Sequence, residues 1–243
     1  MSQEAAPVVE PSALASSSRE PADHVIPEGL PSIPAAAPDE PWSAAFKDFE
    51  RADAAQPWKP GGVVFVGSSS IRLWADLERQ FTGWPAVIKR GFGGSQLADC
   101  VRNAKRLVSL YQPSLVLLYA GDNDLAAGRS PAQVRRSFEL FVAGVREKQP
   151  GLPVAFISIK PSPSRARLMA NVREANRLIQ EYAAQAPNVH FIDVFTPMLA
   201  PNGEPRADLF APDALHLSPA GYTLWKQVIS TSLPPSLWTP TPP

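Results

Sequence analysis

The stretch Val63-Val64-Phe65-Val66-Gly67-Ser68-Ser69-Ser70 decides the fold of this chain. Its apolar residues, mostly β-branched, predict a buried strand, and the glycine and serines that follow predict a turn at the carboxyl end of that strand. Similar apolar runs recur at residues 86–90, 115–120, 154–159 and 189–194. Buried runs of this kind are typical of a parallel sheet that is covered on both faces.

Segments with helical periodicity separate these runs. Ser130-Pro131 is a typical helix start, and Pro150-Gly151 ends the same pattern at about residue 148. The other predicted helices cover residues 42–54, 72–80, 95–111, 165–186 and 219–231. The alternation predicts an α/β fold, a flavodoxin-like three-layer α/β/α sandwich with a five-stranded parallel sheet. Ligands of such sheets bind beyond the carboxyl ends of the strands.

The chain of 243 residues is long enough for one large domain, which we place at residues 42–233. Residues 1–41 are rich in Pro and Ala with few large apolar side chains, so we expect a disordered tail. Residues 234–243 form a second, Pro-rich tail. The role of the N-terminal tail and the oligomeric state stay open.

Composition excludes several classes of partner. The 23 basic and 23 acidic residues cancel, which argues against nucleic acid and favours a small-molecule substrate. No apolar run approaches the roughly 20 residues of a membrane span, and the N-terminus lacks the pattern of a signal peptide, so we expect a cytoplasmic protein. The single cysteine, Cys100, lies in a helical pattern and is interpreted as a buried structural thiol.

The three serines after the first strand suggest nucleophilic catalysis. A serine hydroxyl is a weak nucleophile that needs a base, whereas a serine alone at this position more often caps the next helix. His216 is the best candidate base, because Asp213, three residues earlier in the same loop, could orient its ring. Asp208 is a weaker alternative orienter. His24 falls in the tail, and His190 lies in an apolar run that suggests a packed or edge-strand residue.

Four short segments together carry a family resemblance. In chain order they are Gly67-Ser68-Ser69-Ser70, Gly91-Phe92-Gly93-Gly94, Gly121-Asp122-Asn123-Asp124 and Asp213-Ala214-Leu215-His216. Their residue types and order resemble the four blocks of the SGNH hydrolases, the GDSL-type esterases and lipases, over about residues 60 to 232. The resemblance implies a Ser69 nucleophile, His216 and Asp213 as its partners, and an oxyanion hole of Gly94, Asn123 and the Ser69 N–H group.

One departure from the family pattern concerns the nucleophile. The family's Gly-Asp-Ser is Gly67-Ser68-Ser69 here, so three adjacent serines compete, and counting from Gly67 selects Ser69 over Ser68 and Ser70. Attack on an ester leaves negative charge on oxygen, which donors such as the Asn123 amide and the Gly94 N–H can stabilise. Taken singly, Gly94 and Asn123 could equally serve tight turns.

The resulting expectation is a serine esterase that hydrolyses small acyl esters, such as acetyl esters of carbohydrates, through an acyl-enzyme intermediate. The alternatives are a lysophospholipase, thioesterase or acyltransferase on the same fold, or a non-catalytic carbohydrate-binding module. No cofactor is expected, and no metal, because no His or Cys accompanies Asp122 and Asp124.

Three basic residues and two tryptophans receive a structural interpretation. Lys160, Arg165 and Arg167 surround a Pro-Ser-Pro-Ser segment after the fourth strand, where a solvated loop is favoured over a role at the rim of the site. Trp74 and Trp84 are interpreted as packing residues.

Overall fold

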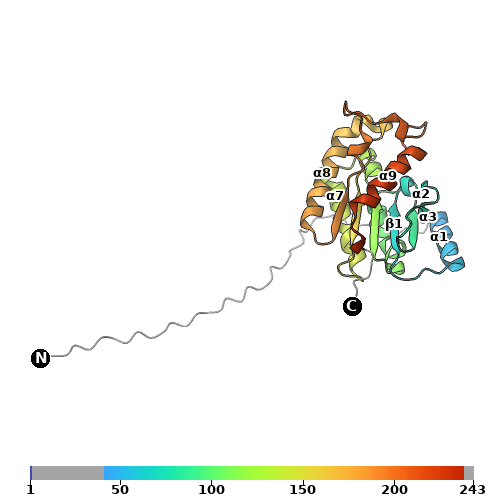
Figure 1. Cartoon of the computed structure of the whole chain (residues 1–243), viewed down its shortest axis with the longest axis vertical. Coiled ribbons are helices and arrows are strands. Elements are labelled where there is room, and N and C mark those ends of the chain that lie inside the picture. The colour runs from blue at the N-terminus through green and yellow to red at the C-terminus, as the bar shows by residue number, and fades with distance from the viewer. Residues whose placement is uncertain (2–40, 238–243) are drawn as a thin grey trace. The chain divides into compact units, whose positions relative to one another are not determined.

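The computed structural model describes residue 1 and residues 41–237 (Figure 1). The predictions made for residues 2–40 and 238–243, which include His24, lie outside the described residues. The described residues 41–237 belong to one compact unit. Among the residues that the structure describes, no helix combines the length and apolar character needed to cross a membrane.

The core of this unit is a five-stranded parallel sheet, as predicted. Its order is β2-β1-β3-β4-β5, the flavodoxin-like arrangement. The strands are β1 (Val63–Gly67), β2 (Val87–Gly91), β3 (Leu115–Tyr119), β4 (Val154–Ile157) and β5 (Val189–Ile192). The chain moves outward from β1 to β2 and then returns to the other side of β1 for β3. The β1–β3 boundary is therefore the switch point, where a doubly wound sheet leaves room for a ligand.

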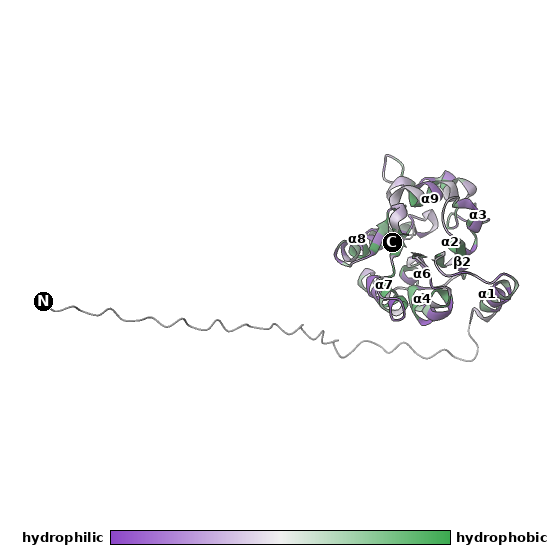
Figure 2. Cartoon of the chain, turned by 60° about the horizontal axis from the view of Figure 1, so that its bottom comes forward, coloured by the Kyte–Doolittle hydropathy of each residue, from purple (hydrophilic) through white to green (hydrophobic). Residues whose placement is uncertain are grey.

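Helices cover both faces of the sheet, with α4 and α7 on the opposite side from α3 and α9 (Figure 2). The first face carries α1 (Ser43–Ala55), α4 (Leu97–Arg102), α5 (Ala104–Leu107), α7 (Pro131–Arg146) and α8 (Met169–Gln185). The second carries α2 (Ser69–Arg72), α3 (Leu77–Gln80) and α9 (Pro219–Ser232). The chain also forms α6 (Asp122–Ala126) and the 3₁₀ turns η1 (Ser109–Tyr111), η2 (Pro163–Leu168), η3 (Thr196–Met198), η4 (Ala207–Leu209) and η5 (Pro235–Leu237).

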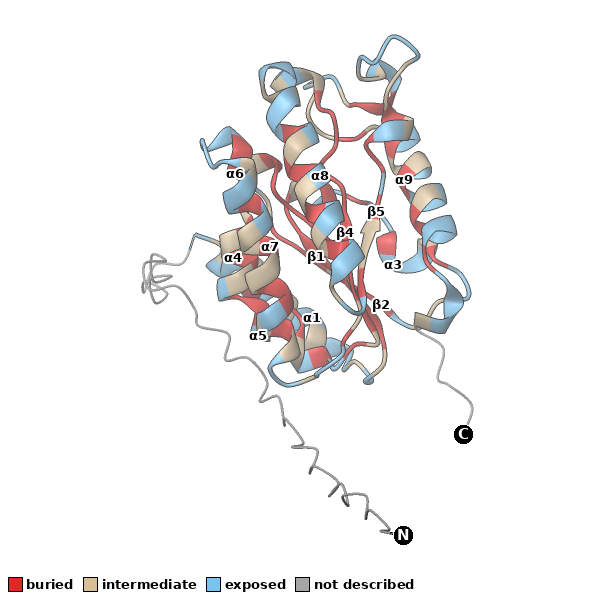
Figure 3. Ribbon diagram, turned by 90° about the vertical axis from the view of Figure 1, so that its left-hand side faces the viewer, coloured by how far each residue is buried: buried red, intermediate tan, exposed pale blue. Residues whose placement is uncertain are grey.

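Alternation along each strand divides the core into two clusters. Val64 and Val66 of β1 point to the α7 side, whereas Val63 and Phe65 point to the α9 side. Every residue of β1 and β3 is buried, so these central strands supply side chains to both clusters, and the inward faces of the helices are buried against them (Figure 3). The positions at the strand ends are consequently fixed from both sides.

The predicted packing residues occupy this core. Trp74 and Cys100 are fully buried, as expected, and the partly buried Trp84 packs against the second cluster. Trp74 contacts Phe65 and Trp225 through edge-to-face ring pairs.

The predicted helix boundaries were wrong in three places. The helix expected over 95–111 is broken into α4, α5 and η1, because the chain leaves helical geometry at Asn103, whose side-chain amide donates to the Asp99 carbonyl at 3.0 Å. The helix expected over 72–80 is instead α2 and α3, separated by a left-handed Asp76. The first turn of the helix expected over 165–186 is 3₁₀, and α8 begins at Met169.

Candidate active site

Ser69 and Asn123 lie at the switch point of the sheet. Ser69 is the first residue of α2, directly beyond β1, and Asn123 lies in the first turn of α6, beyond β3. A tight turn was the alternative interpretation of Asn123, but Gly121 precedes a short helix, with Asp122 and Asp124 in its first turn. Acidic residues at a helix start are favourable because they face the positive end of the helix dipole. The adjacent strands β1 and β3 bring these two helix starts together.

The geometry distinguishes the three serines. Ser68 and Ser70 are fully buried, whereas Ser69 is partly exposed. The Ser68 N–H donates to the Tyr119 carbonyl at 3.0 Å, and a Cβ atom at Gly67 would come within 1.9 Å of that same oxygen. Glycine is therefore required at position 67 for the chain to turn here, and the turn leaves Ser69 as the serine that faces the site.

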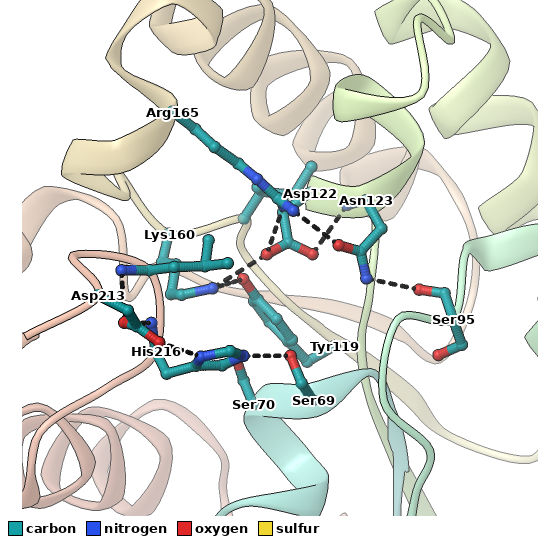
Figure 4. A network of polar contacts seen from close by, with 12 residues as sticks. Ser69, Ser70, Ser95, Tyr119, Asp122, Asn123, Lys160, Arg165, Asp213 and His216 are labelled. Atoms are coloured by element: carbon teal, nitrogen blue, oxygen red, sulfur yellow. Dashed lines mark hydrogen bonds and ion pairs between the residues drawn. The ribbon is translucent and has the colours of Figure 1, made fainter. Parts of the chain in front are cut away.

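The segment from Asp213 to His216 approaches Ser69 from the loop before α9. His216 Nε2 lies 3.0 Å from Ser69 Oγ, and His216 Nδ1 lies 2.6 Å from Asp213 Oδ2 (Figure 4). The structure thus brings these three predicted residues into one hydrogen-bonded chain. Asp208, the alternative orienter, pairs with Arg206 at 2.9 Å instead.

The Asp213 carboxylate is held by its own loop. Its Oδ1 accepts hydrogen bonds from the N–H groups of Leu215 and His216, both at 2.9 Å. The His216 ring and then these backbone donors lower the pKa of Asp213 to about 2, so the carboxylate is ionised at neutral pH. Ala214, the residue after Asp213, has a φ of 54°, a strained value for alanine. The Ala214 carbonyl accepts a hydrogen bond from the Ser164 N–H at 3.0 Å. These contacts fix the ring orientation.

The side-chain amide of Asn123 has one possible orientation. Its Nδ2 donates to the Ser95 carbonyl at 3.0 Å, and its Oδ1 accepts from Arg165 Nη2 at 2.9 Å. An arginine can only donate and a carbonyl can only accept, so a flipped amide would lose both bonds. The amide keeps one N–H hydrogen beyond the bond to Ser95.

Behind Asn123 lies a buried group of charges, shown in Figure 4. Lys160 Nζ lies 3.0 Å from both Asp122 Oδ2 and the Tyr119 hydroxyl, and Arg165 Nη1 lies 3.1 Å from the same Asp122 oxygen. Burial alone would raise the pKa of Asp122, but Lys160 and Arg165 hold it below its ordinary value. Burial would lower the pKa of Lys160, but Asp122 and Tyr119 raise it. Both groups are therefore charged.

The prediction of a solvated loop for the basic residues was wrong for two of the three. The Lys160 side chain is 1% exposed and that of Arg165 is 20% exposed, and both contact Asp122. Only Arg167 is exposed as expected. The position of Lys160 and Arg165 in the sequence could have indicated a role at the site. Both residues follow β4 at the carboxyl edge of the sheet, where polar groups from several strands converge.

Two backbone N–H groups belong to residues that line the site. Across the part of the chain that the structure describes, neither the Ser69 N–H nor the Gly94 N–H has a hydrogen-bond acceptor. Gly94 has a φ of 76°, which favours glycine. An open hollow of about 460 Å³ is lined by Ser69, Arg72, Gly93, Gly94, Asn123, Leu215 and His216. All four predicted segments therefore contribute residues to one hollow, and two of these residues, Ser69 and Gly94, have backbone N–H groups with no acceptor among the described residues.

The remaining titratable candidates lie outside this hollow. Burial raises the pKa of Asp124 to about 6, and both of its oxygens accept from the Leu97 N–H at 3.1 Å, so it anchors the start of α4. His190 lies in β5, which is an edge strand, so its interpretation as an edge-strand residue is confirmed. Burial lowers the pKa of His190. Within the described residues, no group of three or more His, Cys, Asp or Glu side chains could hold a metal ion.

Comparison with known proteins identifies structures that share this fold. The structure is similar to that of a GDSL-like lipase from Bacteroides thetaiotaomicron VPI-5482, at 20% identity, covering 76% of this chain and 95% of that chain, with a TM-score of 0.64. A lipase/acylhydrolase from Enterococcus faecalis is 23% identical over 69% of this chain and 92% of its own, with a TM-score of 0.59. The family 3 carbohydrate esterase of Clostridium thermocellum is 15% identical over 70% and 94%, with a TM-score of 0.54.

At these identities the likeness shows the fold. No curated protein matches the chain. Residues 54–224, however, match the GDSL-like Lipase/Acylhydrolase family across both sides of the hollow. The chain therefore belongs to the GDSL-like lipase and acylhydrolase family, a family of ester hydrolases.

Proposed function

We propose that the protein is a serine esterase that hydrolyses small acyl esters through an acyl-enzyme intermediate. The observation that carries the proposal is the hydrogen-bonded chain from Ser69 through His216 to Asp213, with bonds of 3.0 Å and 2.6 Å. His216 Nε2 takes the Ser69 proton as Oγ attacks the ester carbonyl, and the Asp213 carboxylate stabilises the imidazolium that forms. The same imidazolium then protonates the leaving alcohol. Water completes the cycle by the reverse sequence of proton transfers.

The negative charge that develops on the carbonyl oxygen is assigned to three donors. These are the N–H groups of Ser69 and Gly94 and the Asn123 amide hydrogen that Ser95 does not use. Their support is that all three residues line the hollow beside His216. Such donors are already oriented before the reaction, so they stabilise the transition state without reorganisation.

The lining of the hollow supports a small substrate. Besides two glycines, Leu215 is the only apolar residue among those that line it, and Arg72 adds a charged side chain to the lining. A long acyl chain needs burial of each methylene to gain about 0.8 kcal/mol. This hollow supplies little apolar surface for that purpose. Acetyl esters of carbohydrates fit it better than long-chain lipids, and a carbohydrate esterase shares the fold.

Fluorophosphonate labelling tests the proposal, because such probes react with activated serines. The intact protein is expected to be labelled at Ser69 and to hydrolyse p-nitrophenyl acetate, and Ser69→Ala is expected to lose both properties. Ser68→Ala and Ser70→Ala are matched controls, since both hydroxyls are buried. Labelling that survives Ser69→Ala would assign the nucleophile elsewhere, and an unlabelled protein would favour a binding module. A rise in ester product on addition of an acceptor alcohol would identify an acyltransferase.

A further inference from the structure

Trp42 contacts the candidate oxyanion site from outside the part of the chain that matches the family. Its indole Nε1–H donates to the Gly93 carbonyl at 2.9 Å. Trp42 directly precedes α1, whereas the family match begins at residue 54. The contact is therefore supplied by an N-terminal extension of the family region, and the four motif segments do not account for it.

The Gly93 carbonyl, which accepts this bond, belongs to the same peptide group as the Gly94 N–H, a candidate oxyanion donor. The Gly93 C=O and the Gly94 N–H form one planar trans peptide, so they point in opposite directions. The Ser95 N–H donates to the Phe92 carbonyl at 3.4 Å, and Gly94 has a φ of 76°, as at the third position of a type II turn. A type I turn differs by a flip of this central peptide. Glycine on both sides makes that flip sterically easy.

The N-terminal helix holds Trp42 in place. Its Phe46 is buried and packs against Phe92 with ring centroids 5.5 Å apart, and Trp42 itself packs edge-to-face on Phe92 at 5.3 Å. At the other end of the helix, Asp53 pairs with the buried Arg90. The indole donor is therefore presented to the turn by a helix that is anchored at both ends.

We infer that Trp42 is a positioning residue for the oxyanion hole: its bond to the Gly93 carbonyl keeps the Gly93–Gly94 peptide oriented with the Gly94 N–H facing the reacting carbonyl. The inference rests on the function proposed above. Trp42 touches no reacting atom. It acts by preventing the flip that would replace the N–H donor with a carbonyl oxygen, a group that repels the oxyanion.

The test compares Trp42→Phe with Trp58→Phe. Phenylalanine at 42 keeps an aromatic ring beside Phe92 and removes the N–H donor. Trp58 donates its indole N–H to the Asp53 carboxylate at 2.6 Å, so Trp58→Phe removes an indole donor away from the hollow, while Asp53 keeps Arg90 as the partner that anchors the helix. The amide resonance of Gly94, measured in isotope-labelled full-length protein, reports the peptide orientation without reference to activity. It is expected to shift or broaden in Trp42→Phe and to stay unchanged in Trp58→Phe.

Kinetics with p-nitrophenyl acetate then connect this orientation to catalysis. Loss of one net hydrogen bond that holds a transition-state donor corresponds to a fall in kcat of about two- to tenfold, with KM unchanged and the melting temperature nearly unchanged. An unaltered Gly94 resonance in Trp42→Phe overturns the inference, as does a shifted resonance with normal kcat. An intact protein without Ser69-dependent turnover instead overturns the proposed function, whatever the Gly94 resonance shows.

Discussion

Replacing Arg165 with methionine tests whether the buried charges hold Asn123 for catalysis. The guanidinium donates to Asn123 Oδ1 at 2.9 Å and pairs with Asp122 at 3.1 Å. Methionine retains an unbranched apolar side chain but removes both interactions. Asp122 keeps Lys160 as its partner at 3.0 Å, so the fold is expected to survive.

The expected fall in kcat follows from the hydrogen bond that the Asn123 amide loses. A hydrogen bond to a charged group contributes about 1.5–3 kcal/mol, which corresponds to a factor of roughly 10 to 150 if all of it acts on the transition state. The Ser95 carbonyl still holds Asn123 Nδ2 at 3.0 Å, so the amide remains partly oriented and the lower limit applies. We expect Arg165→Met to lower kcat about tenfold with little change in KM. Asn123→Ala, which removes the donor itself, is expected to cost about 10²- to 10³-fold.

A double-mutant cycle on p-nitrophenyl acetate measures this dependence. If Arg165 acts through Asn123, Arg165→Met has no further effect once Asn123 is alanine. The matched control is Arg167→Met, since Arg167 is exposed in the same 3₁₀ turn. An equal loss from Arg165→Met in the wild-type and Asn123→Ala backgrounds would refute the reasoning. Thermal unfolding of each variant separates loss of orientation from loss of structure.

Three further outcomes are expected. Burial raises the pKa of Asp124 to about 6, above its ordinary value of 3.8, so the stability linked to its proton is present at about pH 4 and lost as pH rises through 6. Asp124→Asn should therefore raise the melting temperature relative to wild type at about pH 8 but much less at about pH 4, and equal differences at both would contradict this. His216→Ala should lose nearly as much kcat as Ser69→Ala, whereas His190→Ala should retain it, in the same ester assay. Acetyl and butyryl esters should show higher kcat/KM than esters of about eight or more carbons, and a steady rise with acyl length would reveal an acyl tunnel.

Much of the fold could be predicted from the sequence because its signals are local. The runs that became β1 and β3 are apolar at every position, and each position is buried on one or the other face of the sheet. The helix breaks at Asn103 and Asp76 were missed, since each depends on one residue that leaves helical geometry inside an otherwise helical pattern. Periodicity averages over a window and so does not detect a single break.

The arrangement of the site was predictable where residue order carries it. Asp213 and His216 share one loop, and Ser69 and Asn123 each follow a strand, so a parallel sheet brings them to one edge. The pairing of Lys160 with Asp122 was not predictable in the same way. These residues are 38 positions apart, and a lysine in a Pro- and Ser-rich segment has the same local pattern whether it is buried or solvated.

Two of the proposed oxyanion donors, the Gly94 N–H and the Asn123 amide, are connected through Ser95. Its N–H closes the turn that contains the Gly93–Gly94 peptide, and its carbonyl accepts from the Asn123 amide at 3.0 Å. A peptide flip at Gly94 would therefore disturb the residue that holds Asn123, and loss of the Asn123 amide would release one side of the turn. Because residues that share a partner do not contribute independently, the effects of Trp42→Phe and Asn123→Ala on kcat should not add. The proposed arrangement of donors at the hollow thus depends on a set of hydrogen bonds that runs from Trp42 to Arg165, and most of these bonds involve residues outside the proposed triad of Ser69, His216 and Asp213.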